Sequence, residues 1–122
     1  MSSRILVVED DPGIVTMLER GLRLAGHRVT AATDLDAARA AWHDPTHWDL
    51  VLLDVMLPDG DGIELLGERR AVGDATPCVL VTAREEDDLR DRAAAAGADE
   101  YLPKPFAYTD LLACIERLTR SR

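Results

Sequence analysis

The apolar run Leu50–Leu53, which ends abruptly at Asp54, constrains the possible folds of this chain more than any other stretch. The run is too short for a typical helix and is bounded by turn residues, which is typical of a strand buried on both faces in a parallel sheet. Open α/β sheets bind their ligands beside the carboxyl ends of such strands. Pro58–Gly60 predict a tight turn soon afterwards, and Asp61–Glu64 has the pattern of a capping box that opens a helix. Asp54 is therefore a candidate reactive group on the rim of a rigid sheet.

Short apolar runs alternate with helical patterns along the whole chain. Each strand-like run is followed by a segment with apolar residues at three- and four-residue spacing. Such alternation over a single domain of 122 residues predicts a doubly wound, parallel α/β sheet of five strands, with five helices and right-handed crossovers. The predicted strands are 4–8, 28–32, 50–53, 78–81 and 100–103, and the predicted helices are 12–25, 34–44, 63–72, 85–96 and 109–118.

The starts of three helices are predicted from their capping residues. Asp11 suits the cap of the first helix, and Thr33 or Asp34 the cap of the second. Ala107 is a poor cap, so we expect the last helix to begin late, with Thr109 as its cap.

The fourth predicted helix, 85–96, is weakly anchored. Its candidate core face is Leu89 with Ala93 and Ala96, and the other positions are charged residues or alanine. Buried apolar area stabilises a fold by roughly 25 cal/mol per Å², so alanines contribute much less than leucines would. We expect this helix to be among the easiest to shift.

Composition argues against several classes of protein. A hydrophobic share of 47% with 30% charged residues is ordinary for a soluble domain, and no apolar run approaches the roughly 20 residues that span a bilayer. Because the start of the chain lacks a signal-peptide pattern, we expect a cytoplasmic location without membrane contact. The net charge of −9 argues against direct nucleic-acid binding, since phosphate contacts require a basic surface.

The cysteines and histidines lack the spacing of metal ligands. Cys78 lies in an apolar strand-like run and Cys114 in a helical segment, so we expect buried or partly buried thiols rather than a disulfide. His27, His43 and His47 lie in predicted loops or at helix ends, where we expect them to be solvated.

Polar side chains lie at the ends of four predicted strands. Glu9 and Asp10 follow the first strand, Asp54 ends the third, Thr82 follows the fourth and Lys104 follows the fifth. The carboxyl ends of parallel strands meet at one edge of a sheet, so these side chains can converge.

The converging residues suit phosphoryl transfer onto Asp54. Its carboxylate is ionised at neutral pH and needs no general base to act as a nucleophile. Three carboxylates against one lysine leave a local charge of −2. Like charges about 5 Å apart repel by roughly 3 kcal/mol at an effective dielectric constant near 20. We therefore expect Mg²⁺, which prefers carboxylate oxygens, while Lys104 and the Thr82 hydroxyl hold phosphoryl oxygens.

Four ordered motifs carry a family resemblance. The stretches V-V-E-D-D-P, L-L-D-V-M-L-P-D-G-D-G, V-T-A-R and G-A-D-E-Y-L-P-K-P-F resemble the receiver domain of two-component response regulators. The resemblance covers essentially the whole chain and is closest to the winged-helix transcription-factor class, through M-L-P-D-G-D-G and T-A-R. It implies a flavodoxin-like fold with strand order 2-1-3-4-5. It also implies a signalling switch that catalyses only its own phosphorylation and dephosphorylation, not an enzyme with an external substrate.

The resemblance implies a role for each residue of the acidic group. Asp54 would be the phosphoacceptor and Asp10 a direct Mg²⁺ ligand. Glu9 would reach the metal largely through water, and the carbonyl of Met56 would supply a further ligand.

The resemblance also implies how the signal leaves the site. Thr82 and Lys104 would bind the phosphoryl group, Tyr101 would turn inward with Thr82 on activation, and Lys104–Pro105 would be a cis peptide. The expected phosphodonor is a sensor histidine kinase, and the expected output is transcription. Residues 1–122 would form the receiver domain, with an effector domain following it in the natural protein.

The same class dimerises on activation through its fourth helix, fifth strand and fifth helix, with charges paired across that face. Four charged residues match this pattern, namely Arg90, Asp99, Glu100 and Asp110. Cys114, however, stands where the class usually has an arginine. A thiol cannot make the bidentate contact of a guanidinium. We therefore expect Asp99 to lack its partner and the activated dimer to be weak.

Two other functions share parts of this pattern. Aspartyl-phosphate phosphohydrolases of the haloacid-dehalogenase type place a second aspartate two residues after the nucleophile, where this chain has Met56. A flavodoxin-like binding module would need a phosphate-cradling loop after the first strand, but Glu9–Asp11 would repel a phosphate there. Asp59 and Asp61 suggest a calcium loop, but no acid stands at the next alternate position, so we reject that reading.

Overall fold

All five predicted strands join one parallel sheet. The computed structural model describes residues 2–43, 48–83 and 88–120. The strands lie in the order β2-β1-β3-β6-β7, and because β6 and β7 are the fourth and fifth strands of this sheet along the chain, the predicted order 2-1-3-4-5 is confirmed. The strands are β1 (Arg4–Val8), β2 (Arg28–Ala32), β3 (Leu50–Asp54), β6 (Cys78–Thr82) and β7 (Glu100–Pro103).

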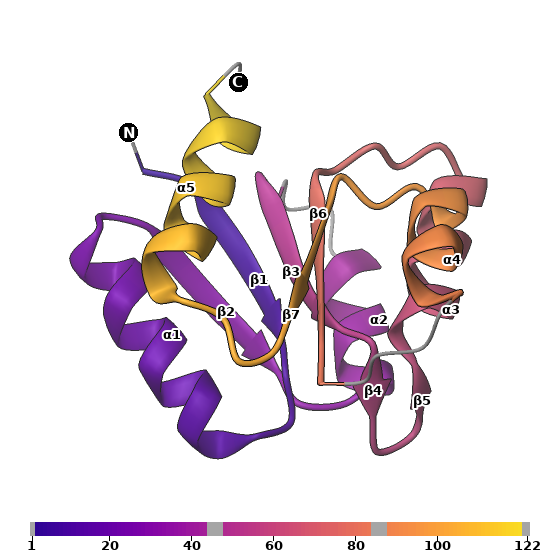
Figure 1. Ribbon diagram of the computed structural model, residues 1–122, viewed down its shortest axis with the longest axis horizontal. Helices are drawn as coiled ribbons and strands as arrows, with labels where there is room; N and C mark the ends of the chain where they lie inside the picture. The colour runs from indigo at the N-terminus through magenta and orange to yellow at the C-terminus, as the bar shows by residue number, and fades with distance from the viewer. Residues whose placement is uncertain (1, 44–47, 84–87, 121–122) are drawn as a thin grey trace.

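Helices cover both faces of the sheet, as Figure 1 shows. On one side lie α1 (Pro12–Leu24) and α5 (Tyr108–Thr119), and on the other lie α2 (Leu35–His43), α3 (Gly62–Ala71) and α4 (Leu89–Ala96). The predicted five helices and doubly wound class are therefore confirmed.

Alternate strand residues enter two separate cores. Ile5 and Val7 of β1 pack in the core under α1 and α5, whereas Leu6 and Val8 pack in the core under α2, α3 and α4. All five residues of β3 are buried, because each side of this central strand faces a helix layer. Apolar residues therefore occupy the interior of the sheet, and the functional polar groups lie at the strand ends.

Acidic side chains cap three of the helices. Asp11 accepts hydrogen bonds from the backbone N–H groups of Gly13 and Ile14 at 2.8 and 3.1 Å. Asp34 caps α2 through the N–H of Ala37 at 2.7 Å, and Asp61 caps α3 through the N–H of its second residue at 2.8 Å. Each satisfies N–H groups that a helix leaves without an internal partner.

The last helix begins earlier than its capping residues predict. It starts at Tyr108, with Ala107 at the cap position and no side-chain capping bond, so the late start at Thr109 is wrong. The aromatic ring of Tyr108 lies against α1, where a Cβ on Gly21 would come within 2.8 Å of it. Because most helix stability in proteins comes from tertiary packing, this contact fixes the first turn without a cap.

The two cysteines are thiols, as the sequence predicts. Cys78 is buried and Cys114 partly buried, and both are free. Burial raises the pKa of the Cys78 thiol to about 12, so it stays protonated. No helix in the described parts of the chain is long and apolar enough to cross a bilayer.

His27 is buried, contrary to the expectation that it is solvated. Only 9% of the residue is exposed, and its Nδ1 accepts a hydrogen bond from the N–H of Ser3 at 3.3 Å. Burial lowers the pKa of His27 from 6.5, and the carboxylates of Glu116 and Asp49 oppose this shift without cancelling it. His43 is exposed beside Arg69, and His47 lies outside the described residues.

The lowered pKa of His27 predicts a loss of stability in mild acid. The folded protein protonates His27 less readily than the unfolded chain does. The contribution of neutral His27 to the unfolding free energy is therefore complete above the unfolded pKa of about 6.5, and it is lost as pH falls through the folded pKa. Urea unfolding at pH 7.5 and pH 5.5 should show a larger drop in unfolding free energy for the wild type than for His27→Asn. Equal drops in the two proteins would show that His27 does not carry this pH dependence.

Candidate functional site

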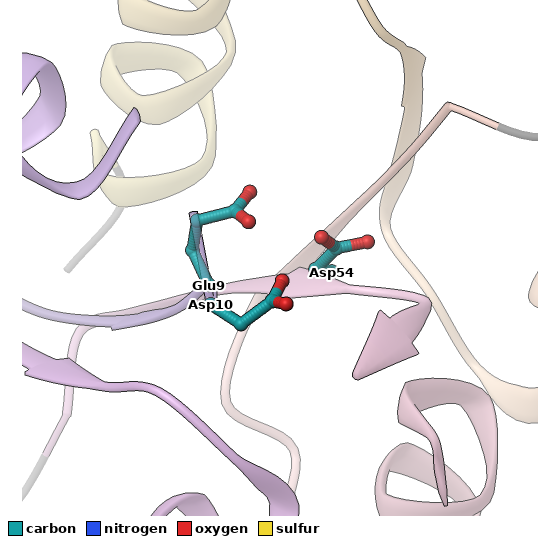
Figure 2. A group of neighbouring side chains, drawn as sticks. All are labelled: Glu9, Asp10 and Asp54. Carbon is teal, nitrogen blue, oxygen red and sulfur yellow. The ribbon is translucent and has the colours of Figure 1, made fainter. Parts of the chain in front are cut away.

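Three carboxylates meet at the carboxyl edge of the sheet. Glu9 and Asp10 follow β1, and Asp54 is the last residue of β3. β1 and β3 pair in parallel with Val8 opposite Leu53, so the residues that follow leave the sheet side by side. Figure 2 shows the three side chains gathered there, and they offer ligand oxygens within 4.8 Å of one another.

Lys104 joins this cluster from the end of β7, an edge strand of the sheet. It follows β7, and its Nζ donates to Glu9 Oε1 at 2.6 Å and to Asp54 Oδ2 at 2.8 Å. Glu9 and Asp54 are 2% and 4% exposed, so these are largely buried ion pairs. Burial opposes the charge on Lys104, but the hydrogen bonds and charges of Asp54 and Glu9 outweigh burial and raise the pKa of the ammonium. Lys104 is therefore a permanent cation of the site at neutral pH.

Thr82 ends β6 and completes the row of strand ends. It is 1% exposed, and its backbone carbonyl accepts from the N–H of Lys104 at 2.7 Å. The peptide bond Lys104–Pro105 is cis, as the resemblance implies. The residues predicted from the ends of the first, third, fourth and fifth strands thus lie along one edge.

A small hairpin that the sequence analysis did not predict follows Asp54. It consists of β4 (Met56–Leu57) and β5 (Gly60–Asp61), paired antiparallel around the predicted turn. The N–H of Met56 donates to Asp54 Oδ1 at 3.0 Å, so one oxygen of Asp54 is held by the hairpin and the other by Lys104.

The base of the hairpin returns closely to Asp54. The N–H of Gly62 donates to the carbonyl of Val55 at 2.7 Å. A side chain at Gly62 would collide with the carbonyl oxygen of Asp54. The glycine in the D-G step therefore permits this close approach of backbone to backbone.

The donor set fits a hard divalent cation. Within the described residues, Glu9, Asp10 and Asp54 form the one cluster of three potential metal-ligating side chains, and all of their donors are oxygen. Three carboxylates against the single ammonium of Lys104 leave a local charge of −2. A divalent ion would neutralise this charge, and oxygen ligands are those that Mg²⁺ prefers.

Tyr101 lies on β7, on the side of the sheet that α4 covers. Its half-buried ring packs against the core under α2, α3 and α4. The guanidinium carbon of Arg90 lies 4.7 Å from the ring centroid, within the range of a cation–π contact. The structure thus places the ring between the fifth strand of the sheet and α4.

Asp99 is bound by Arg70 within the chain, a contact separate from the expected pairing across a dimer. Its Oδ2 accepts from Arg70 Nη2 at 3.3 Å and from the N–H of Cys78 at 2.8 Å. Arg70 lies near the end of α3 and reaches across to the turn after α4, where it also donates to the carbonyl of Gly97. Arg70 and Asp99 lie 29 residues apart in the chain, so no local pattern in the sequence indicates this contact.

The other residues of the predicted dimer face lie on α4, β7 and α5. Glu100 pairs with Arg117 of α5 at 2.5 Å, and Arg90 lies over Tyr101. Asp110 is exposed in the first turn of α5, and Cys114 is partly buried on the same helix.

The fold and these strand-end residues define the class of protein. Residues 5–116 match the family model of the response regulator receiver domain, and the chain belongs to that family. Receiver domains are generally signalling switches rather than metabolic enzymes, interact with histidine kinases and use Mg²⁺.

Named relatives fall in the same family. The chain is 39% identical over 122 residues to the transcriptional regulatory protein PrrA of Mycobacterium tuberculosis, covering 99% of this chain and 52% of that protein. It is 42% identical over 121 residues to the response regulator MprA of Mycobacterium ulcerans, covering 98% and 51%. The chain thus spans about half the length of these relatives. The receiver domain of the Francisella response regulator 1452 matches with a TM-score of 0.91 at 27% identity, over 98% of both chains.

Proposed function

We propose that this domain accepts a phosphoryl group from a histidine kinase on Asp54. The observation that carries the proposal is the way in which the carboxylate of Asp54 is held. Lys104 and the N–H of Met56 hold its two oxygens, and Glu9 and Asp10 lie beside it. A nucleophile that is already oriented in this way reacts without a large entropy cost of fixing its side chain.

The reaction exchanges one bond to phosphorus for another. A carboxylate oxygen of Asp54 forms the new O–P bond as the P–N bond of the donor phosphohistidine breaks, and the histidine leaves with that electron pair. Lys104 and the Thr82 hydroxyl would hold phosphoryl oxygens. Mg²⁺ would supply positive charge that offsets the negative charge of the phosphoryl oxygens. Asp10, Asp54 and the Met56 carbonyl would hold it directly, and Glu9 largely through water.

The proposal predicts one phosphorylation site. With Mg²⁺ and a small-molecule phosphodonor, intact-mass spectrometry should show the addition of one phosphoryl group, stable in acid and lost in base as for an acyl phosphate. Asp54→Asn should abolish the addition, and Asp10→Asn should slow it by removing a charge that binds the metal. Asp36→Asn, which changes an exposed aspartate on α2, serves as the control. Uptake by Asp54→Asn equal to that of the wild type would rule out Asp54.

We propose that phosphorylation is read out through α4 and Tyr101. Only Leu89 and Ala93 of α4 are buried, so little apolar area holds this helix. Arg92 pairs with Asp61 at 2.8 Å, and Arg70 binds the carbonyl of Gly97 after the last turn. A partly exposed ion pair such as Arg92–Asp61 is worth about 0–1 kcal/mol, which a change at the phosphorylation site can overcome. Residues 84–87, part of the segment predicted to move, lie outside the described residues.

A substitution at Thr82 tests this coupling. Thr82→Ala should still accept a phosphoryl group, because Asp54 and the acidic cluster remain. It should transmit less of the change, because the hydroxyl that would follow the phosphoryl group is gone. Amide hydrogen exchange over 89–97, with and without beryllofluoride as a phosphoryl mimic, measures the response. An identical response in the wild type and Thr82→Ala would refute the coupling.

We further propose that the activated domain dimerises weakly through α4, β7 and α5. Cys114 supplies no charge to this face, and Asp99 already binds Arg70 within the chain. A partner molecule would therefore have to compete with an internal contact for Asp99.

Restoring an arginine should strengthen the dimer. Partly exposed ion pairs contribute up to about 1 kcal/mol each, so two symmetric copies in Cys114→Arg add up to about 2 kcal/mol, and about 1.4 kcal/mol is a tenfold gain in affinity. Analytical ultracentrifugation with beryllofluoride under reducing conditions measures this, with Cys114→Ser as the matched control. An unchanged dimer constant in Cys114→Arg would mean that this face is not used in the proposed way.

The proposed output is control of transcription. It is supported by the relative PrrA, which is named a transcriptional regulatory protein and is about twice as long as this chain. The proposed partner upstream is a sensor histidine kinase, and we propose that the domain itself makes no direct contact with nucleic acid, given its net charge of −9.

A further inference from the structure

The hairpin β4–β5 carries two groups that the proposed reaction needs. The N–H of Met56 holds Asp54 Oδ1, and the carbonyl of the same residue is a proposed metal ligand. Each strand of the hairpin has only two residues, paired as Met56 with Asp61 and Leu57 with Gly60. An isolated two-stranded hairpin is at best marginally stable in water, so contacts outside the hairpin must fix its position.

Asp59, at the tip of the hairpin, binds the start of α2. Its Oδ1 accepts from the N–H of Leu35 at 2.8 Å, and its Oδ2 from the N–H of Asp36 at 3.2 Å. Asp34 caps the same helix separately, through the N–H of Ala37. Two aspartates thus divide the free N–H groups of one helix end, and one of them belongs to the hairpin.

Gly60 brings the hairpin tip into contact with the same helix turn. A Cβ at this position would lie 2.7 Å from Leu35 Cδ1, and the residue has φ +150°. Leu35 is itself buried, 5% exposed, so it offers the hairpin a fixed surface. The hairpin therefore meets α2 through two hydrogen bonds and a close apolar contact.

The electrostatics of the helix end favour this contact. Hydrogen bonds from the N–H groups of Leu35 and Asp36 lower the pKa of the exposed Asp59 carboxyl, although desolvation opposes the shift. Asp59 is therefore fully ionised at neutral pH, and charge-assisted hydrogen bonds to N–H groups are about twice as strong as neutral ones. The partial positive charge of a helix N-terminus adds to the attraction.

We propose that Asp59 is a positioning residue for the phosphorylation site. By binding α2 it fixes the hairpin, and the hairpin in turn holds the N–H and carbonyl of Met56 at Asp54. This inference rests on the proposed function, because it assigns Asp59 a role in metal binding and phosphorylation at Asp54. Asp59 touches neither the metal site nor Asp54 and acts only through the backbone of 56–61.

A purely structural role, in which Asp59 only caps α2, makes a different prediction. Asp34 caps the same helix and carries the same charge, but it is not part of the hairpin. If capping or the loss of one negative charge were the whole effect, Asp34→Ala and Asp59→Ala would behave alike. Asp59→Asn provides a second comparison, because it loses the charge but keeps one oxygen that can accept from Leu35.

The test measures metal binding by the unphosphorylated protein. Mn²⁺ serves as the probe, with free ion counted by electron paramagnetic resonance and Mg²⁺ added as competitor. Asp59→Ala should weaken binding by about threefold to tenfold, at or below the range for residues that orient metal ligands directly. Asp59→Asn should show a smaller loss, and Asp34→Ala should bind as the wild type does. Thermal unfolding checks that all four proteins are folded at the assay temperature.

Phosphorylation kinetics give an independent readout. For Asp59→Ala the initial rate at low Mg²⁺ should fall by a similar factor and should recover toward the wild-type rate at high Mg²⁺, because Asp54 itself is unchanged. The amide resonance of Met56 should shift in Asp59→Ala and stay in place in Asp34→Ala.

The outcomes separate this inference from the proposed function. Wild-type protein that neither binds Mn²⁺ nor accepts a phosphoryl group would overturn the proposed function. If the wild type does both, the inference on Asp59 is overturned by unchanged binding in Asp59→Ala. It is also overturned by an equal loss in Asp34→Ala, or by an equal loss in Asp59→Asn and Asp59→Ala.

Discussion

The site depends on one buried interaction, the ammonium of Lys104 bound between the carboxylates of Glu9 and Asp54. Removing Lys104 would leave two buried carboxylates without compensation, at a cost of roughly 3–5 kcal/mol. The pair is possible only because β1, β3 and β7 end at the same edge of a parallel sheet. Two carboxylates around one ammonium leave a net negative charge, and Asp10 adds a further carboxylate. This negative charge makes the edge of the sheet suited to a divalent cation and then to a phosphoryl group.

The backbone that follows Asp54 is the second half of the site. The hairpin after β3 binds one oxygen of Asp54 while Lys104 binds the other, so this carboxylate is held from two directions. The tip of the hairpin reaches α2, and Asp61 at its base caps α3 and pairs with Arg92 of α4. Three helices of one face are therefore connected to the loop beside Asp54, the proposed phosphoacceptor. A change at Asp54 has a direct physical route to that face.

The charges of the α4, β7 and α5 face are largely satisfied within the chain. Arg70 binds Asp99, Arg117 binds Glu100, and Arg90 lies over the ring of Tyr101. In the class that the chain resembles, such charges pair across a dimer. Here Asp99, Glu100 and Arg90 each already have a contact within the chain, while Asp110 is exposed and Cys114 adds no charge. The resemblance identifies the residues of this face but not their partners, and the internal pairs favour a weaker association.

The sequence by itself determined where the strands lie along the chain and which residues end them, because apolar periodicity and strand-end position are local patterns. Asp54, Glu9 and Lys104 could therefore be predicted to converge. The order of the strands in the sheet came only from the family resemblance. Only the tertiary structure decided which groups touch: the bond from Asp59 to Leu35 spans 24 residues, and that from Arg70 to Asp99 spans 29. Such contacts depend on how helices pack on the sheet, and neither composition nor spacing encodes that packing. The burial of His27 and the early start of α5 were missed for the same reason, since packing against distant segments overrode the local preference.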